Sequence, residues 1–133
     1  MSEQENTKIV QQAYQFFKSA DLQSLLGLMS EDVNWQLPEI ENVPFSGKRQ
    51  GREAVKQFFY TLAESQETVS FEPREFVAQN DKVVALGTYT WRLRANRREY
   101  GGEWAHVFTV RDGKIAGFHE YMDTAAAAAA FRG

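Results

Sequence analysis

The pair Asp112-Gly113 constrains this chain more than any other feature of its sequence. Both residues tolerate the positive φ that a tight hairpin turn requires, and the pair lies between two runs whose side chains alternate with a period of two. The sequence therefore predicts a long β-hairpin over residues 99–123. Because successive side chains of a strand point to opposite sides of a sheet, each arm of this hairpin has two distinct faces.

The outgoing arm of the hairpin places one carboxylate among apolar side chains. Phe118, Glu120 and Met122 share one face, whereas His119 and Tyr121 share the other. An acidic side chain between two apolar ones is either a functional group or an edge residue that reaches water.

Three helices are predicted ahead of the strands. Ser2 and Glu5 have the spacing of a capping box, so a first helix should begin there. Asp21 can cap a short second helix that ends near Ser30. A third stripe of apolar residues at helical spacing covers residues 51–63.

Strands make up most of the remaining chain. Residues 33–37 alternate and are stopped by Pro38, while residues 68–78 and 82–94 read as a pair of strands joined by a turn. Residues 39–50 predict a long loop, of a kind that often covers a site. Helices followed by a strand meander indicate an α+β fold, with helices packed on one face of a curved antiparallel sheet.

Two further segments are given no function. The tail, residues 124–133, contains six consecutive alanines and predicts a weak helix or a frayed end. Arg92, Arg94, Arg97 and Arg98 form a basic hairpin tip, which could grip an anionic substrate or partner. In an acidic protein, the favoured interpretation is an exposed strand end.

The composition is that of one globular domain over residues 1–133. Hydrophobic residues make up 43% of the chain, and the ten phenylalanines indicate a large apolar interior or cavity wall. The net charge of -3 disfavours nucleic acid as a partner. With no cysteine, a polar N-terminus and no long apolar run, we expect a soluble cytoplasmic protein that neither spans nor binds a membrane.

Three stretches of the chain, residues 18–39, 43–59 and 104–124, resemble the SnoaL-like, ketosteroid-isomerase-related branch of the nuclear transport factor 2-like (NTF2-like) superfamily. The resemblance implies a cone, in which three N-terminal helices pack on the concave face of a curved, mostly antiparallel sheet and enclose a pocket. It also implies a homodimer formed through the outer face of the sheet.

The resemblance does not carry over the catalytic groups of the ketosteroid isomerases. Their tyrosine, carboxylate base and protonated aspartate correspond to Ala13, Leu37 and Ala105 here. Tyr14 lies one residue from the first position and would point about 100° away on the helix. Steroid isomerisation by that mechanism is therefore not expected.

One carboxylate matches two other branches of the resemblance. In limonene-epoxide-hydrolase relatives and in SnoaL polyketide cyclases, a last-strand aspartate is catalytic, and Glu120 occupies its place. Those hydrolases also use an arginine and an aspartate, two residues apart on the middle strand. The corresponding positions here are Glu103 and Ala105, so the triad that positions water in those hydrolases is incomplete.

We therefore predict Glu120 as a proton-transfer base, because an apolar cavity disfavours the charged form of a carboxylate and allows it to take and return a proton. Glu103 and Asp123 are the other candidate acids. Their alternatives are a solvated or arginine-paired Glu120, an exposed Glu103 and an Asp123 that caps the tail. The predicted apolar lining, which could equally be ordinary core, consists of Trp35, Leu37, Phe45, Phe59, Ala105, Phe118 and Met122.

The two histidines are predicted outside the site. His106 alternates with Trp104 and Phe108, away from Ala105, and His119 is opposite in parity to Glu120. We expect both on the outer, dimer-facing surface. No metal-ligand motif or phosphate-binding glycine loop is present, so neither a metal nor another cofactor is predicted.

The prediction from sequence is a SnoaL-like protein that binds a small apolar, cyclic molecule and acts as a proton-transfer isomerase or cyclase. The first alternative is a non-catalytic domain that binds a small ligand or only dimerises. The second is an epoxide-hydrolase-like hydrolase with a degenerate site.

Overall fold

A computed structural model describes residues 2–133 of the chain, which form four helices and six strands. The helices are α1 (Glu3–Lys18), α2 (Leu22–Gly27), α3 (Arg52–Ser65) and α4 (Thr124–Arg132). The strands are β1 (Met29–Gln36), β2 (Lys48–Gln50), β3 (Gln66–Gln79), β4 (Lys82–Leu93), β5 (Glu99–Arg111) and β6 (Lys114–Met122). None of these helices is long and apolar enough to cross a membrane.

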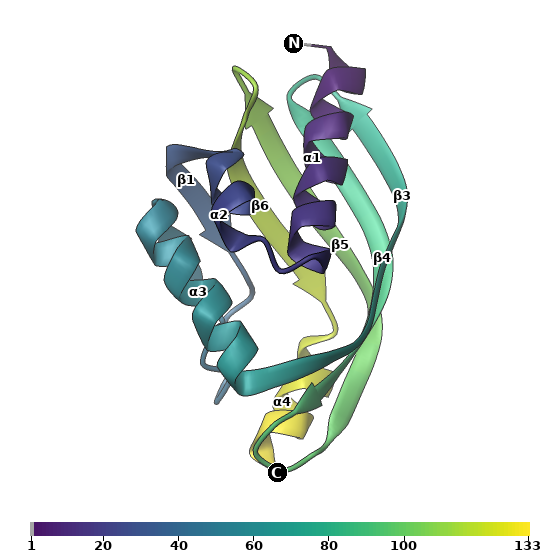
Figure 1. Ribbon diagram of the computed structural model, residues 1–133. Helices are drawn as coiled ribbons and strands as arrows, with labels where there is room; N and C mark the ends of the chain where they lie inside the picture. The colour runs from purple at the N-terminus through teal and green to yellow at the C-terminus, as the bar shows by residue number, and fades with distance from the viewer. Residues whose placement is uncertain (1) are drawn as a thin grey trace.

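The six strands form one sheet in the order β2-β1-β6-β5-β4-β3. The β1 and β6 strands pair in parallel, and every other pair is antiparallel. The sheet is curved, and α1, α2 and α3 lie on its concave side (Figure 1). The α+β fold expected from the sequence, with helices on the concave face of a mostly antiparallel sheet, is confirmed.

Local signals in the sequence set the helix starts. The Ser2 hydroxyl accepts a hydrogen bond from the Glu5 amide, and the Glu5 carboxylate accepts one from the Ser2 amide, so the capping box forms as predicted. Asp21 caps α2 by accepting from the Ser24 amide. This helix ends at Gly27, before the expected Ser30, because β1 begins at Met29, a fully buried residue.

The predicted hairpin is formed by β5 and β6. Asp112 and Gly113 have φ values of 52° and 75°, as the tight reversal requires. The turn fixes the register of the two strands, so that Phe108 lies opposite Phe118 and His106 lies opposite Glu120. Residues directly opposite each other in a sheet share a face. This register therefore decides which side chains enter the interior together.

The tail is more ordered than the sequence indicated. Residues 124–132 form α4, whose Ala127 and Ala130 are buried, and Phe131 contacts Phe45 and Tyr100 with ring centroids 5.7 and 6.2 Å away. The helix lies at the end of the sheet far from the N-terminus (Figure 1). Short alanine side chains let α4 approach the sheet closely and close that end of the interior.

Candidate functional site

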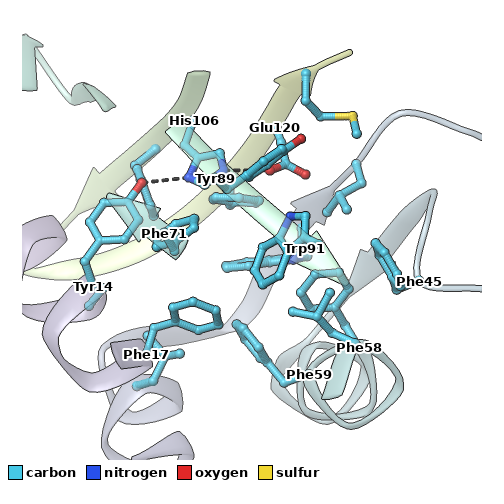
Figure 2. A pocket seen from close by; sticks show the side chains of 18 of the residues that line it. Tyr14, Phe17, Phe45, Phe58, Phe59, Phe71, Tyr89, Trp91, His106 and Glu120 are labelled. Atoms are coloured by element: carbon cyan, nitrogen blue, oxygen red, sulfur yellow. Dashed lines mark hydrogen bonds and ion pairs between the residues drawn. The ribbon is translucent and has the colours of Figure 1, made fainter. Parts of the chain in front are cut away.

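A cavity of about 80 Å³ lies between the helices and the concave face of the sheet. Its wall is largely aromatic, with phenylalanines from α1, α3 and β3 on one side and Tyr89 and Trp91 of β4 on another (Figure 2). Among the described residues, Glu120 is the one carboxylate in this wall. The cavity therefore presents a single carboxylate to a largely aromatic space.

A chain of two hydrogen bonds joins three polar side chains from three different elements. The Tyr14 hydroxyl of α1 lies 2.7 Å from Nδ1 of His106 on β5. The other ring nitrogen, Nε2, lies 2.8 Å from Oε2 of Glu120 on β6 (Figure 2). His106 is 5% exposed, and the Glu120 side chain is 13% exposed. Contact with the buried His106 ring therefore fixes the position of the Glu120 carboxylate.

The geometry of this chain assigns the proton of the histidine ring. Desolvation, and then the charge of Glu120, raise the pKa of Tyr14 well above 10, so its hydroxyl remains protonated. When this hydroxyl donates to Nδ1 of His106, Nε2 is the ring nitrogen that bears the proton, and it points at Oε2 of Glu120. These contacts leave Oε1 of Glu120 without a hydrogen-bond partner among residues 2–133.

Aromatic stacking restrains the histidine ring. The indole of Trp104 stacks on His106 at 4.0 Å with an interplanar angle of 20°, and Phe118 contacts it at 4.7 Å. A ring held between these neighbours has little freedom to rotate away from Glu120. The position of the carboxylate therefore depends on the packing of the β5-β6 hairpin.

The cavity wall also contains hydrogen-bonding groups that are separate from this chain. The Tyr100 hydroxyl donates to Oε1 of Gln66 at 2.8 Å, and burial raises the pKa of Tyr100 and of Tyr89 above 10. The indole N–H of Trp35 is buried and has no hydrogen-bond partner among residues 2–133. An unpaired buried donor is costly, so it is available to a bound oxygen atom.

Most of the predicted lining residues are in the cavity wall. Glu120 is there too, flanked on β6 by two of them as expected. The wall includes Trp35, Leu37, Phe45, Phe59, Phe118 and Met122.

Three predicted residues lie elsewhere. Ala105 points to the opposite face of β5 and is not in the cavity wall, which corrects the prediction. Glu103 shares that outer face and is exposed, so it cannot share a proton with Glu120. Asp123 is exposed and caps α4 by accepting from the Ala126 amide at 3.0 Å, which is the alternative role that the sequence suggested.

The prediction for His106 was wrong. The buried face of β5 consists of Trp104, His106, Phe108 and Val110, and it faces the cavity side. The sequence did contain the signal, because this face is far more apolar than the one through Glu103 and Ala105. His119 does lie on the other face of β6, where its ring stacks on that of the exposed Tyr121.

Tyr14 was also missed. The sequence argument turned it away from the site, yet it lies in the cavity wall beside Ala13. The α1 face that meets the interior runs through Val10, Ala13, Tyr14 and Phe17, at spacings of three and four residues. A tyrosine within that stripe could have been recognised as an interior polar group.

The other charged side chains of the described residues form neither a metal site nor a free basic patch at the hairpin tip. In residues 2–133, no group of three or more histidine, aspartate and glutamate side chains could hold a metal ion. At the basic hairpin tip, Arg92 pairs with Glu99 at 2.6 Å, and both Arg94 and Arg97 pair with Glu67. Such exposed pairs reduce the positive charge available to an anionic partner.

The sequence was compared with models of known protein families. Residues 10–118 match the SnoaL-like domain. The chain belongs to this family. No curated protein matches the chain. The fold described above is thus that of a SnoaL-like domain.

Solved structures of several proteins resemble this SnoaL-like chain closely. An NTF2-like protein from Burkholderia xenovorans LB400 is 34% identical, with 98% of each chain covered and a TM-score of 0.89. An NTF2-like protein of unknown function from Burkholderia pseudomallei K96243 is 25% identical, with 100% of each chain covered and a TM-score of 0.89. TerC, co-crystallised with polyporic acid, is 26% identical, with 97% of this chain and 99% of TerC covered and a TM-score of 0.86.

Proposed function

We propose that this SnoaL-like protein binds a small, apolar, cyclic molecule with an enolisable group and moves a proton on it, as an isomerase or cyclase, with Glu120 as the base. The observation that carries the proposal is the single Glu120 carboxylate in the wall of an aromatic cavity, with Nε2 of His106 lying 2.8 Å from one of its two oxygens. A carboxylate held next to a bound carbon acid can accept a proton from it.

The proposed step begins at the free oxygen of Glu120. A C–H bond next to a carbonyl group breaks, its proton forms an O–H bond at Oε1, and the electron pair moves into the carbonyl, whose oxygen becomes an enolate. The unpartnered N–H of Trp35 is one donor in the wall that is available to that oxygen. Return of the proton to another carbon completes an isomerisation. Attack of the enolate carbon on a carbonyl in the same molecule closes a ring, and the proton held at Oε1 passes to the oxygen of the alkoxide that forms.

Tyr14 and His106 act in this proposal as positioning residues. The Tyr14 hydroxyl keeps Nδ1 of His106 as an acceptor, so the proton of the ring stays on Nε2 and points at Oε2. That contact fixes the rotation of the carboxylate and directs Oε1 toward the ligand. Because the ring is already protonated on the side facing Glu120, the substrate proton goes to Oε1.

The relatives support the class of ligand. TerC was co-crystallised with polyporic acid. This compound is a dihydroxybenzoquinone that carries two phenyl rings, so it combines enolic hydroxyl groups with flat apolar rings. A wall rich in phenylalanine, tyrosine and tryptophan suits one flat ring of this kind.

A second candidate is binding without turnover. It is favoured by the absence of the ketosteroid isomerase groups at Ala13, Leu37 and Ala105. The geometry does not favour the epoxide-hydrolase alternative, because Glu103 and Ala105 lie outside the cavity and no second carboxylate of the described chain lines it.

Exchange of a carbon-bound proton with solvent separates these candidates. The bicyclic ketone 2-tetralone is incubated in D₂O with the protein, and deuterium incorporation next to the carbonyl is followed by NMR. The wild type should exchange faster than buffer, and Glu120→Gln should slow the protein-dependent rate by about 10²- to 10⁴-fold. Glu103→Gln, on the outer face, should leave the rate unchanged.

Two results would overturn the proposal. One is exchange by Glu120→Gln at the wild-type rate while its thermal unfolding is unchanged. The other is a wild-type rate no greater than that of buffer, which would favour binding without turnover if 2-naphthol, the aromatic counterpart of the tetralone enol, still binds.

A further inference from the structure

A groove of about 820 Å³ runs along the outside of the cone, between the C-terminal end of α1, the α3 helix and the start of β3. It shares part of its wall with the inner cavity, including Phe17, Phe59, Phe71 and Trp91. The same side chains therefore face the cavity on one side and the groove on the other.

The partition between the two spaces is made of side chains. The Phe17 ring contacts those of Phe59 and Phe71, with centroids 6.0 and 5.2 Å away, and all three residues are only half-buried. No backbone ladder joins α1 to α3 at this point, so rotation of these rings opens a passage without breaking the sheet.

Apolar side chains are exposed along the groove. Tyr60 of α3 and Val69 of β3 line it, at 45% and 46% exposure. The pairing of β3 with β4 shifts register between Thr68 and Ser70, so a bulge puts Val69 in this wall. Bulges are often found where a strand presents a side chain to a functional site. Tyr60 and Val69 therefore form an exposed apolar surface next to the cavity.

The volumes of the cavity and the groove indicate that one ligand would occupy both. Sites for small molecules are typically about 300–1,000 Å³. The cavity, at about 80 Å³, is too small for a molecule of two or three rings, whereas the groove has the required volume. A ligand that reaches Glu120 must therefore extend beyond the cavity. The opposite end is closed by α4, whose buried alanines would have to leave their contacts.

We propose that the groove is a subsite for the apolar body of the ligand, whose head passes between Phe17, Phe59 and Phe71 to Glu120. The ligand is then an elongated molecule, with an enolic or phenolic head and an apolar ring or chain several carbons long. The location of the head rests on the proposed function, whereas the location of the body rests on the groove alone.

Two phenols of different length test the subsite. Dissociation constants of 4-ethylphenol and 4-hexylphenol are measured by calorimetry on the full chain. Burial of two to four of the additional methylenes makes the longer phenol bind about 15- to 200-fold tighter. Ala63 is exposed and lines the groove but not the cavity, so Ala63→Phe fills the groove and should reduce this ratio to about 3-fold or less. Gln57→Phe, exposed on the same helix outside the groove, should keep the wild-type ratio.

Backbone amide shifts give a readout that does not depend on catalysis. Binding of 4-hexylphenol should shift the amide signals of Thr68 and Val69, and those shifts should be lost in Ala63→Phe. An unchanged affinity ratio in Ala63→Phe, or shifts confined to Phe45 and Phe131 at the α4 end, would overturn the groove proposal.

The two proposals fail in different ways. If Glu120→Gln does not weaken 4-ethylphenol, or if that phenol does not bind, the proposed head position at Glu120 is wrong. The groove proposal still stands if 4-hexylphenol shifts Thr68 and Val69, and it falls if those signals do not move.

Discussion

Replacing Tyr14 with phenylalanine removes a single hydrogen bond from the site and leaves its ring packing in place. The lost contact is the 2.7 Å bond to Nδ1 of His106, while the Tyr14 ring contacts with Phe71 and Trp104 are retained. His106 is 5% exposed, so its nitrogen would be left buried without a partner. An unsatisfied buried group costs about 1–3 kcal/mol, which for a chain of this size lowers Tm by about 4–12 °C.

Urea unfolding followed by tryptophan fluorescence measures this cost. Tyr60→Phe is the matched control, because Tyr60 is 45% exposed and its variant should stay within about 0.5 kcal/mol of the wild type. Nitrogen NMR of His106 should report the Nε2–H tautomer in the wild type and a mixture in Tyr14→Phe. A loss no larger than that of Tyr60→Phe, with an unchanged tautomer, would refute the assignment of Tyr14 as the group that orients His106.

Three other outcomes are expected. Because burial raises the pKa of Tyr14, Tyr89 and Tyr100, the unfolded chain loses protons above pH 10 that the folded state keeps. Urea titrations should therefore show the free energy of unfolding falling by up to about 1.4 kcal/mol per pH unit for each tyrosine. A flat profile from pH 9 to 11 would contradict this. Asp123→Ala should cost about 1 kcal/mol through loss of the α4 cap, yet leave deuterium exchange unchanged. We further propose a homodimer, for which light scattering should give about twice the 15.2 kDa chain mass; a monomer would exclude it.

The sequence predicted those parts of the fold that depend on local chemistry. The capping box at Ser2 and Glu5 and the turn at Asp112-Gly113 each need only a few neighbouring residues. The helix formed by the alanine-rich tail was underestimated, because its stability comes from contacts such as that of Phe131 with Phe45, far away in the sequence.

The site was only partly predictable. Alternation placed Glu120 with Phe118 and Met122, which needs only relative positions within one strand. For β5 the absolute face was chosen from the resemblance at Ala105, and an error of one residue moves every side chain of a strand to the other face. The hydrogen bond from Tyr14 to His106 joins residues 92 positions apart, and no local pattern indicates it.

The central claim is that Glu120, oriented by His106, meets the ligand inside the cone. A crystal structure of the protein with 2-naphthol tests it most directly. We predict the naphthol oxygen within hydrogen-bond distance of Oε1 of Glu120, and the rings against Phe17 and Phe59. Naphthol bound on the outer face of the sheet, or bound in the interior with its oxygen directed away from Glu120, would contradict the account.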